Sequence, residues 1–210
     1  MPIAIHVIGS RGRMGSRVVS LASVRSEYKV EEEADNFDVA IDFSSHAATQ
    51  EILKKMVSLK KPIVIGTTGH PSENYAAIEL ASKKIPILFS PNFSLGMAAC
   101  VEAAELLARR LKGSCSVDII EAHHIHKKDK PSGSALKLKQ AINYPDAPIH
   151  SIRSGDIIGD HTVIFTCAGE RIELKHQVHS RDAFAEGALK AASFLLGKDP
   201  GLYSVKDLFS

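Results

Sequence analysis

The sequence predicts an α/β protein in which a doubly wound parallel sheet is joined to a smaller α+β unit with a mixed sheet. Three observations predict this fold class. Strand-like and helix-like segments alternate up to residue 94, a glycine-rich turn follows the first strand, and beyond residue 94 several strand-like segments follow one another directly. Parallel strands need helical crossovers, whereas consecutive strands can pair antiparallel through short turns.

The N-terminal part repeats a strand–turn–helix order. An apolar strand is predicted at Ile3–Ile8, a glycine-rich turn at Gly9–Gly15, and a helix at Ser16–Val24 with apolar residues at helical spacing. Ser72 is expected to cap a later helix, because its hydroxyl can accept a hydrogen bond from a free backbone N–H. The remaining elements are strands at Val39–Phe43, Lys61–Ile65 and Ile85–Phe89 and helices at Ala47–Leu59 and Ser72–Lys83.

The second part begins after Ser94 with a long predicted helix, Leu95–Lys112. A strand at Val117–Glu121 leads into a loop dense in His and Lys, and residues 143–153 are expected to be a brief connection. The last helix, Ala183–Leu196, ends at a glycine. The other elements are a helix at Gly133–Ile142 and strand-like stretches at Asp156–Ile158, His161–Ala168 and Glu170–Ser180.

Composition excludes several classes of protein. The 210 residues are 44% hydrophobic and 24% charged, as in ordinary globular proteins, and the net charge of +2 predicts neither nucleic-acid nor membrane-surface binding. The cysteines Cys100, Cys115 and Cys167 are odd in number and form no C-x-x-C pair, so they predict neither a disulfide framework nor a structural zinc. This cysteine usage fits a reducing compartment. Since we see no basic leader and no apolar run of membrane-spanning length, we expect a cytoplasmic protein.

The segment Gly9-Ser-Arg-Gly-Arg-Met-Gly15 lies between a predicted strand and a predicted helix. Glycines in this position let the backbone turn sharply and approach a pyrophosphate at the helix N-terminus. The spacing is G-x-x-G-x-x-G rather than G-x-G-x-x-G, so a turn without a ligand is the alternative. The strand–helix repeats that follow favour dinucleotide binding and a Rossmann-like domain over residues 1–94.

Three further turns are expected to line the same crevice, because ligands of parallel sheets bind at the carboxyl ends of the strands. These turns are residues 42–44, 66–69 and 90–93. The alternative interpretation is that each of these turns is an ordinary loop without a ligand, and that Asp42 only caps the next helix.

The loop from Glu121 to Ala135 is the strongest constellation of chemical groups in the sequence. Three of its histidines lie within four residues, but no carboxylate or thiol at zinc-site spacing accompanies them. Ser132-Gly-Ser134 opens a helix, whose first N–H groups can bind an anion, and Lys127, Lys128 and Lys130 add positive charge. A proton-transfer residue, an ammonium and a helix N-terminus suit an anionic substrate that gains a proton.

The residues resemble the 4-hydroxy-tetrahydrodipicolinate reductase family, also called dihydrodipicolinate reductase. The matching segments run in the family's order along nearly the whole chain. They are Gly9-x-x-Gly-Arg-Met-Gly15, Ala40-Ile-Asp-Phe-Ser44, Val64-Ile-Gly-Thr-Thr-Gly69, Asn92-Phe-Ser94, Glu121-Ala-His-His-x-His-Lys127, Pro131-Ser-Gly133, Gly155-Asp156, His161-Thr162, Gly169-Glu-Arg171 and Ser180-Arg181.

This resemblance implies hydride transfer from NADH or NADPH to the dehydrated 4-hydroxy-tetrahydrodipicolinate, giving tetrahydrodipicolinate, in diaminopimelate and lysine biosynthesis. It also implies that His123 handles a proton at the reacting centre and that Lys127 donates a proton. Residues 95–180 are implied to bind this small dicarboxylate and to assemble a homotetramer, and residues 181–210 to return to the dinucleotide-binding domain of residues 1–94. The implied substrate contacts are His124, Gly133 and Ser134, and the implied cofactor contacts are Gly9, Ser10, Arg11, Gly12, Arg13, Met14, Gly66, Thr67, Thr68, Ser90, Pro91, Asn92 and Phe93.

The residues leave open how the adenosine ribose is held and which of several functions the fold serves. The family's acidic residue for the adenosine ribose has no clear counterpart in the compressed segment Glu27–Glu33, and Arg11 or Arg13 can alternatively face a 2′-phosphate. The alternative functions are an NAD(P)-dependent dehydrogenase of another small acid such as aspartate, and a non-catalytic dinucleotide-sensing or metal-binding protein, because the same fold hosts many functions.

Overall fold

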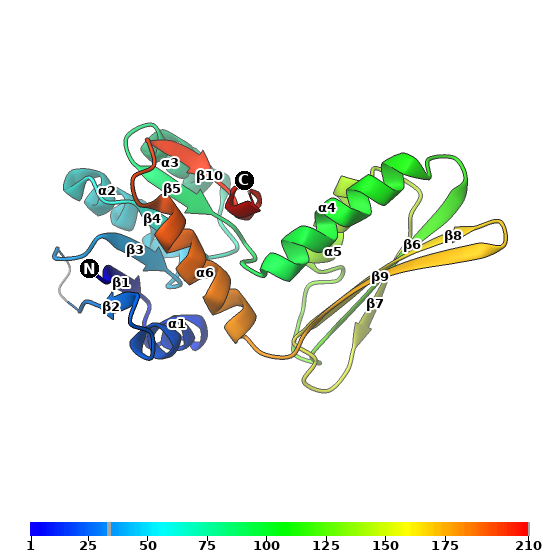
Figure 1. Ribbon diagram of the computed structural model, residues 1–210, viewed down its shortest axis with the longest axis horizontal. Helices are drawn as coiled ribbons and strands as arrows, with labels where there is room; N and C mark the ends of the chain where they lie inside the picture. The colour runs from blue at the N-terminus through cyan, green and yellow to red at the C-terminus, as the bar shows by residue number, and fades with distance from the viewer. Residues whose placement is uncertain (33–34, 210) are drawn as a thin grey trace. The chain divides into compact units, whose positions relative to one another are not determined.

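The alternation of strands and helices in the N-terminal part produces a six-stranded parallel sheet. In the computed structural model, which describes residues 1–32 and 35–209, the strand order is β10-β5-β4-β3-β1-β2 (Figure 1). This sheet belongs to unit 1, made of Met1–Ser94 and Asp182–Ser210, while Leu95–Arg181 form unit 2. The strands of unit 1 are β1 (Ile3–Ile8), β2 (Tyr28–Val30), β3 (Val39–Asp42), β4 (Ile63–Ile65), β5 (Pro86–Phe89) and β10 (Gly201–Tyr203).

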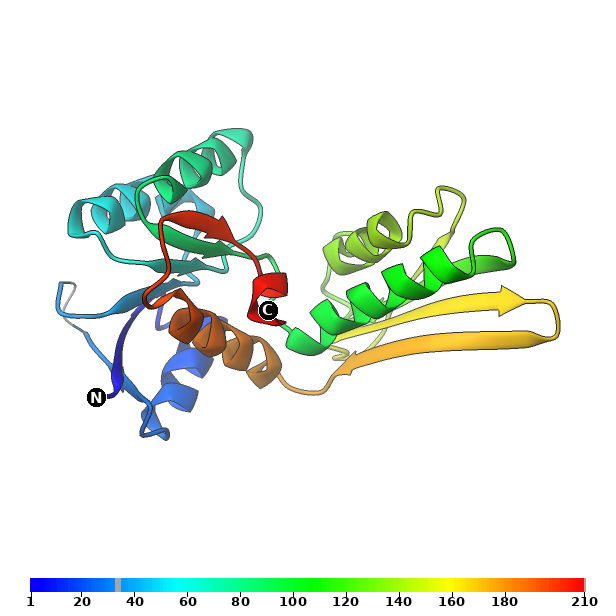
Figure 2. The ribbon, with the colours of Figure 1, turned by 45° about the horizontal axis from the view of Figure 1, so that its top comes forward.

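Helices cover both faces of this sheet, which is why β3 and β4 are buried along their whole length (Figure 2). Helices α2 and α3 share one apolar cluster with the sheet, and α6 packs on β3, β4, β5 and α1. The helices are α1 (Arg13–Ser23), α2 (Thr49–Leu59), α3 (Ser72–Ser82) and α6 (Asp182–Leu195), with short 3₁₀ helices η1 (His46–Ala48) and η2 (Val205–Phe209).

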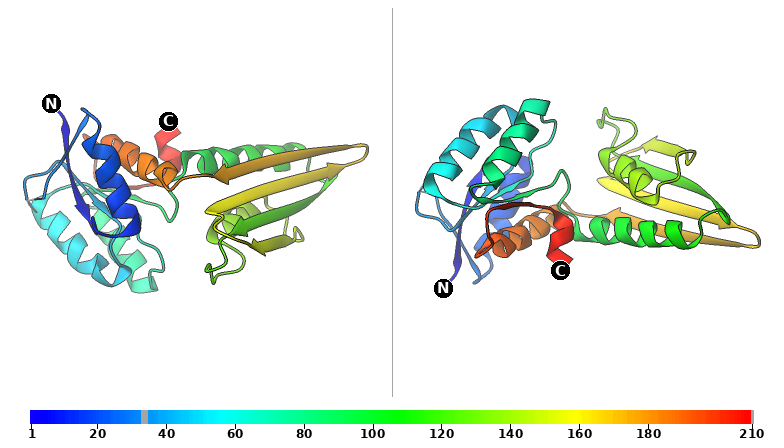
Figure 3. Two further views of the ribbon diagram at one scale, coloured as in Figure 1. Left: turned by 90° about the horizontal axis from the view of Figure 1, so that it is seen from below. Right: turned by 90° about the horizontal axis from the view of Figure 1, so that it is seen from above.

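Unit 2 is a four-stranded mixed sheet with two helices on one face (Figure 3). The strand order is β7-β6-β8-β9, with β6 and β7 parallel and the other pairs antiparallel. Apolar side chains of both helices pack on Val117, Ile119, Val163 and Phe165 of the sheet. The elements are β6 (Cys115–His123), β7 (Ile149–Arg153), β8 (Gly159–Cys167), β9 (Glu170–Val178), α4 (Leu95–Arg110) and α5 (Gly133–Ile142).

The predicted fold class is therefore confirmed, while several local predictions are wrong. Residues 143–153 are not a mere connection, because they contain β7, and Asp156–Ile158 form a turn and a link before β8 rather than a strand. Ser72 is the first residue of α3 and not its cap, since the residue at the N-cap is Pro71 and no side chain caps this helix start. The short strands β2 and β10 were not expected.

The expectation that the cysteines stay unpaired is also wrong. Cys115 and Cys167 form a disulfide, because the β6–β8 register places them directly opposite each other, with Cα atoms 4.2 Å apart. Their separation of 52 residues concealed this neighbourhood in the sequence. The argument for a reducing compartment from cysteine usage loses its support.

Within residues 1–32 and 35–209, no helix is both long enough and apolar enough to cross a membrane. The same residues contain no cluster of three or more His, Cys, Asp or Glu side chains arranged to hold a metal ion.

Candidate active site

The glycine-rich turn after β1 is a close contact between backbone segments. Gly9 has a φ of +82°, and a Cβ there would lie 2.8 Å from the Cα of Ser44. A Cβ on Gly15 would lie 2.2 Å from the carbonyl oxygen of Gly9, which in turn accepts a 2.9 Å hydrogen bond from the N–H of Gly12. Larger residues at Gly9 and Gly15 would force the turn away from α1 and β3.

The start of α1 suits an anionic ligand such as a pyrophosphate. Its N-cap is Gly12, no side chain caps the helix start, and the first turn contains no acidic residue. By contrast, the first turns of α2 and α3 contain Glu51 and Glu73. Helix N-termini attract anions through free N–H groups and the helix dipole, so this turn fits the phosphates of a dinucleotide. The predicted contacts Gly9 to Met14 all lie here, and the side chains of Arg11 and Arg13 are exposed.

Strand β2, in the segment expected to face the adenosine ribose, is short. β2 ends at Val30, which pairs with Ile5, whereas β1 continues to Ile8. The side chain of Glu31 forms an ion pair with Lys29. Glu33, part of the acidic segment considered for the ribose, lies outside the described residues.

The turns after β3 and β4 meet at the same edge of the sheet as the glycine turn. A Cβ on Gly66 would lie 2.2 Å from the ring of Phe43, and this ring also meets Phe93 edge-on, with centroids 5.9 Å apart. The structure thus brings together the predicted turns that follow β1, β3, β4 and β5, as the shared carboxyl edge of parallel strands requires.

Side-chain hydrogen bonds hold two of these turns. The Thr67 hydroxyl lies 2.9 Å from His70 Nε2, and Asn74 donates a 2.6 Å hydrogen bond to the carbonyl of His46. The Ser90 hydroxyl donates to the carbonyl of Asn92 at 2.6 Å. The side chains of Thr67 and Ser90 therefore stabilise the loops in which the sequence places cofactor contacts.

Asp42 does not cap the following helix. One carboxylate oxygen accepts from the Ser44 N–H at 2.8 Å and from the Ser44 hydroxyl at 2.6 Å, while Ser45 caps η1. Within the described part of the chain the other oxygen, Oδ2, is buried without a partner. Burial raises the pKa of this carboxyl, although the bonds from Ser44 oppose the shift.

In unit 2, strand geometry assembles a polar cluster at the end of β6. Side chains alternate across a sheet, so Glu121 and His123 lie on the same buried face as the apolar residues Val117 and Ile119. The register places His161 of β8 opposite Glu121 and Arg153 of β7 beside His123. The polar cluster is these four residues, Glu121, His123, Arg153 and His161.

Glu121 is fully buried and ionised. Arg153 donates to both of its carboxylate oxygens at 2.9 Å, and His123 Nδ1 lies 2.5 Å from Oε2. Burial alone would raise the pKa of Glu121, but the hydrogen bonds from Arg153, Ser151 and His123 outweigh it and lower the pKa to about 2. A carboxylate next to a histidine fixes the ring orientation and the tautomer.

Both histidines of the cluster favour the neutral form. Burial lowers the pKa of His123, and the positive charges of Lys127 and Arg153 add to this, against the opposing effect of Glu121. Burial lowers the pKa of His161 to about 4, with His123 contributing. The two rings meet edge-on with centroids 5.2 Å apart.

The other predicted substrate-side residues lie close by in the chain. Lys127 follows β6, and its Nζ lies 2.8 Å from Asp129 Oδ2. His124 is the first residue after the strand, and Gly133 and Ser134 are the first two residues of α5. Ser132 caps this helix by accepting from the Ala135 N–H at 3.3 Å, and its hydroxyl lies 3.1 Å from His161 Nε2. The cluster is therefore tied to the helix start through His161.

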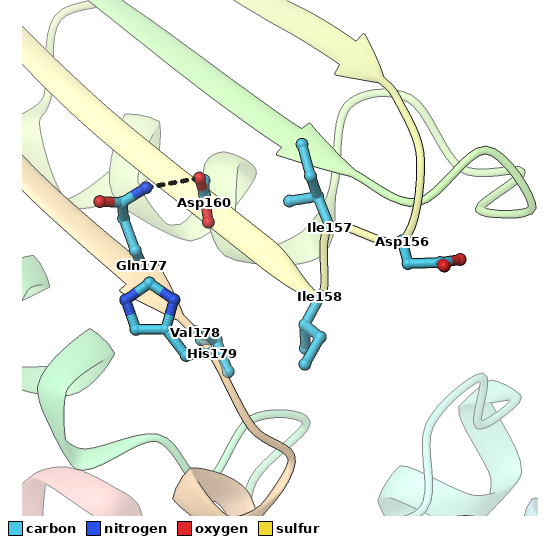
Figure 4. Close-up of a pocket in the computed structure, with 7 residues that line it drawn as sticks. All are labelled: Asp156, Ile157, Ile158, Asp160, Gln177, Val178 and His179. Atoms are coloured by element: carbon cyan, nitrogen blue, oxygen red, sulfur yellow. Dashed lines mark hydrogen bonds between the residues drawn. The ribbon is translucent and has the colours of Figure 1, made fainter.

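A pocket of about 260 Å³ lies in unit 2. Among the residues that line it, Gln177 donates a 2.8 Å hydrogen bond to Asp160 (Figure 4). Its lining residues include none of the predicted site residues. They are Asp156, Ile157, Ile158, Asp160, Gln177, Val178 and His179.

Sequence reasoning left Glu121, Arg153 and His161 without a role. The i, i+2 spacing of Glu121 and His123 on a strand was a usable signal, because it places both on one face. Arg153 and His161 had no such signal, since only the pairing of β7 and β8 with β6 brings them there.

Family sequence models match most of the chain. The model described as "Dihydrodipicolinate reductase, N-terminus" matches residues 23–93, and "Dihydrodipicolinate reductase, C-terminus" matches residues 96–209. A solved structure titled "Dipicolinate bound Dihydrodipicolinate reductase from Paenisporosarcina sp. TG-14" has a TM-score of 0.79 at 22% identity, covering 97% of this chain and 98% of that one. At this identity the structural likeness shows the fold.

Two curated relatives are both called 4-hydroxy-tetrahydrodipicolinate reductase. The protein from Xanthomonas campestris pv. campestris (strain B100) is 42% identical, covering 99% of this chain and 98% of its own. The protein from Akkermansia muciniphila is 39% identical over 239 positions, covering 98% of this chain and 97% of its own. An alignment longer than the 210 residues shows that this relative carries segments absent here. The chain belongs to the dihydrodipicolinate reductase family.

Proposed function

We propose that this protein is an NAD(P)H-dependent 4-hydroxy-tetrahydrodipicolinate reductase of diaminopimelate and lysine biosynthesis. Its reaction is hydride transfer to the dehydrated (2S,4S)-4-hydroxy-2,3,4,5-tetrahydrodipicolinate, giving tetrahydrodipicolinate. The observation that carries the proposal is 42% identity over nearly the whole length of a reductase so named. Family membership favours this reaction over a dehydrogenase of another small acid and over a non-catalytic dinucleotide sensor.

The glycine turn and the loops after β4 and β5 would hold the cofactor. When bound, the nicotinamide supplies the hydride. The uncapped start of α1 would bind the pyrophosphate through its N–H groups, and Thr67, held by His70, would lie near the nicotinamide ribose. Either NADH or NADPH fits this arrangement of backbone donors.

The residues around β6 would handle the proton and the substrate. When a hydride is added to the dicarboxylate substrate, negative charge develops next to the carbon that receives it. A proton must then be added to the substrate to complete the reduction. Lys127 would donate that proton, and His123 would handle a proton at the reacting centre. His124 and the N–H groups of Gly133 and Ser134 would bind the substrate, because a helix start without an acidic residue in its first turn attracts a carboxylate.

A coupled assay tests the activity. Substrate is generated freshly from aspartate semialdehyde and pyruvate by the preceding enzyme, and the oxidation of NADH and of NADPH is followed in parallel. We expect turnover with at least one cofactor, and the ratio of the two kcat/KM values gives the preference. No oxidation of either cofactor, with a known reductase active in the same mixture, would refute the proposal.

We further propose a homotetramer that acts in the cytoplasm. Side chains alternate across the sheet of unit 2, and the face opposite the core carries Ile120, Ile152 and Ile164. Of these, Ile152 is 48% exposed. Apolar side chains on the sheet face away from the helices suit pairing with a second copy. Light scattering of the purified protein tests the assembly, and a monomer would contradict it.

A further inference from the structure

Arg153 connects the two residues that the proposed function places in proton handling. Its guanidinium donates to Glu121, which holds His123, and its Nε donates to the backbone carbonyl of Lys127 at 3.3 Å. We propose that Arg153 is a positioning residue: it fixes the orientation of His123 through Glu121 and, at the same time, the backbone of the segment that carries Lys127. This inference rests on the proposed function for the roles of His123 and Lys127.

The hydrogen bonds of Arg153 argue against direct substrate binding. A guanidinium has five N–H donors in a fixed planar fork. Two of them go to Glu121, and the other three go to the carbonyls of Lys127, Asp129 at 2.5 Å and Ile152 at 2.7 Å. The side chain is only 7% exposed. With every donor used inside the protein, Arg153 acts through the groups it holds.

For His123, the consequence is a fixed tautomer. Glu121 is ionised and can only accept, so the neutral ring places its proton on Nδ1 and leaves Nε2 as the exchanging nitrogen. A Cβ at Gly159 would lie 3.2 Å from Nε2, so the absence of a side chain there leaves room next to this atom. Arg153 controls this arrangement because it fixes both oxygens of Glu121.

For Lys127, the consequence is a fixed backbone. The carbonyls of Lys127 and Asp129 both accept from Arg153, so a two-point contact fixes the segment that carries the ammonium. The same segment places Asp129 beside Lys127 Nζ. One residue on β7 thus orders a loop that contains no strand or helix of its own.

Stability alone does not account for this ion pair. Replacing a buried ion pair with apolar residues of similar volume is often neutral or stabilising, because two charges must lose their water. A buried Glu–Arg pair that also contacts a histidine and a loop is therefore better explained by a requirement for geometry and charge at the site.

The first test compares Arg153→Lys with Arg171→Lys. Lysine keeps the charge but lacks the planar fork, so it cannot reproduce the five bonds. Arg171 is the matched control, because its guanidinium pairs with Glu173 at 2.8 Å on an exposed part of β9. We expect Arg153→Lys to lower kcat about 100-fold, because a displacement of a catalytic group by about 1 Å lowers the rate by roughly this factor. The KM for the cofactor is expected to stay unchanged. Arg171→Lys is expected to behave like the unmodified protein.

The second readout needs no substrate. Nitrogen NMR of the ring reports which nitrogen of His123 carries the proton, and we expect Nδ1 in the unmodified protein and a mixture in Arg153→Lys. A proton on Nδ1 in both, together with an unchanged kcat, would overturn the proposal. If the unmodified protein has no reductase activity, the proposed function fails, and the NMR comparison still decides the positioning role.

Glu121→Gln keeps the inference testable should Arg153→Lys not fold, because it preserves the shape of the side chain. The groups that face His123 are Glu121, Arg153, Lys127 and His161, and only the first raises its pKa. Removing that carboxylate is expected to lower both the pKa of His123 and kcat, and to move the His123-dependent limb of the pH profile to lower pH. A loss of thermal stability with an unmoved limb would show a merely structural role and overturn the proposal.

Discussion

The two units present their predicted ligand contacts in different ways. Unit 1 uses backbone: Gly9, Gly12 and Gly15 bring N–H groups to an uncapped helix start, and close packing determines the shape of the turn. Unit 2 uses charged side chains: Arg153 holds Glu121 by hydrogen bonds, and Glu121 in turn holds His123. Added volume is therefore expected to impair the first site, whereas changed charge or pH is expected to impair the second.

Removing the proposed proton-handling groups is expected to give the largest effect. General acid–base groups contribute roughly 10²- to 10⁴-fold to a rate, so Lys127→Ala and His123→Ala should each lower kcat within that range. Cofactor affinity should persist, because its predicted contacts all lie in unit 1. Steady-state kinetics and fluorescence titration with NADPH measure both quantities, with the exposed Lys112→Ala as control. Loss of cofactor affinity in both variants would contradict the division of roles.

Acid should destabilise the protein in two pH ranges. His161 has a folded-state pKa of about 4, so the unfolded chain binds its proton first, and stability falls as pH drops from about 6.5 to 4. Glu121 has a lowered pKa of about 2, so its contribution is complete above about 4.5 and is lost as pH falls from there towards 2. Each group contributes at most about 3 kcal/mol to the free energy of unfolding.

Urea unfolding at a series of pH values measures these losses. His161→Asn should reduce the loss in the upper range, and a variant of an exposed histidine, His179→Asn, is the control. An equal pH dependence in all three proteins would show that His161 does not titrate as its burial requires.

Crowding at the glycine turn should have an intermediate effect. Gly15→Ala places a Cβ 2.2 Å from the Gly9 carbonyl oxygen, and overpacking of this kind costs about 1–3 kcal/mol. We expect weaker NADPH binding and a lower Tm, while the neighbouring Ser16→Ala, which adds no volume, changes neither. Unchanged cofactor affinity in Gly15→Ala would show that this turn does not bind the cofactor.

The same contrast explains how much the sequence predicts. Glycine spacing and strand–helix alternation are local patterns, so the parallel sheet and the meeting of its turns follow directly from the residues. The polar cluster depends on strand register between segments far apart in the chain, as does the Cys115–Cys167 disulfide. For this reason the motif named His123 and Lys127 as candidates, while only the structure places Arg153 and His161 beside His123.

The smallest effect is expected where the adenosine part of the cofactor is proposed to bind, because unit 1 offers side chains rather than backbone there. β2 stops at Val30 while β1 continues to Ile8, and the exposed Arg11 and Arg13 flank Gly12. If they bind a 2′-phosphate, Arg11→Ala or Arg13→Ala should raise the KM for NADPH about tenfold, equivalent to about 1.4 kcal/mol, and leave the KM for NADH unchanged.

Arg17→Ala is the matched control, because its guanidinium already pairs with Asp182 at 2.6 Å. Equal effects on both cofactors would instead assign Arg11 and Arg13 to the pyrophosphate, which the two dinucleotides share. In that case charged side chains would assist the backbone donors of unit 1, as they do in unit 2. The two sites would then differ only in what fixes their geometry, which is close packing around glycines in unit 1 and the buried Glu121–Arg153 ion pair in unit 2.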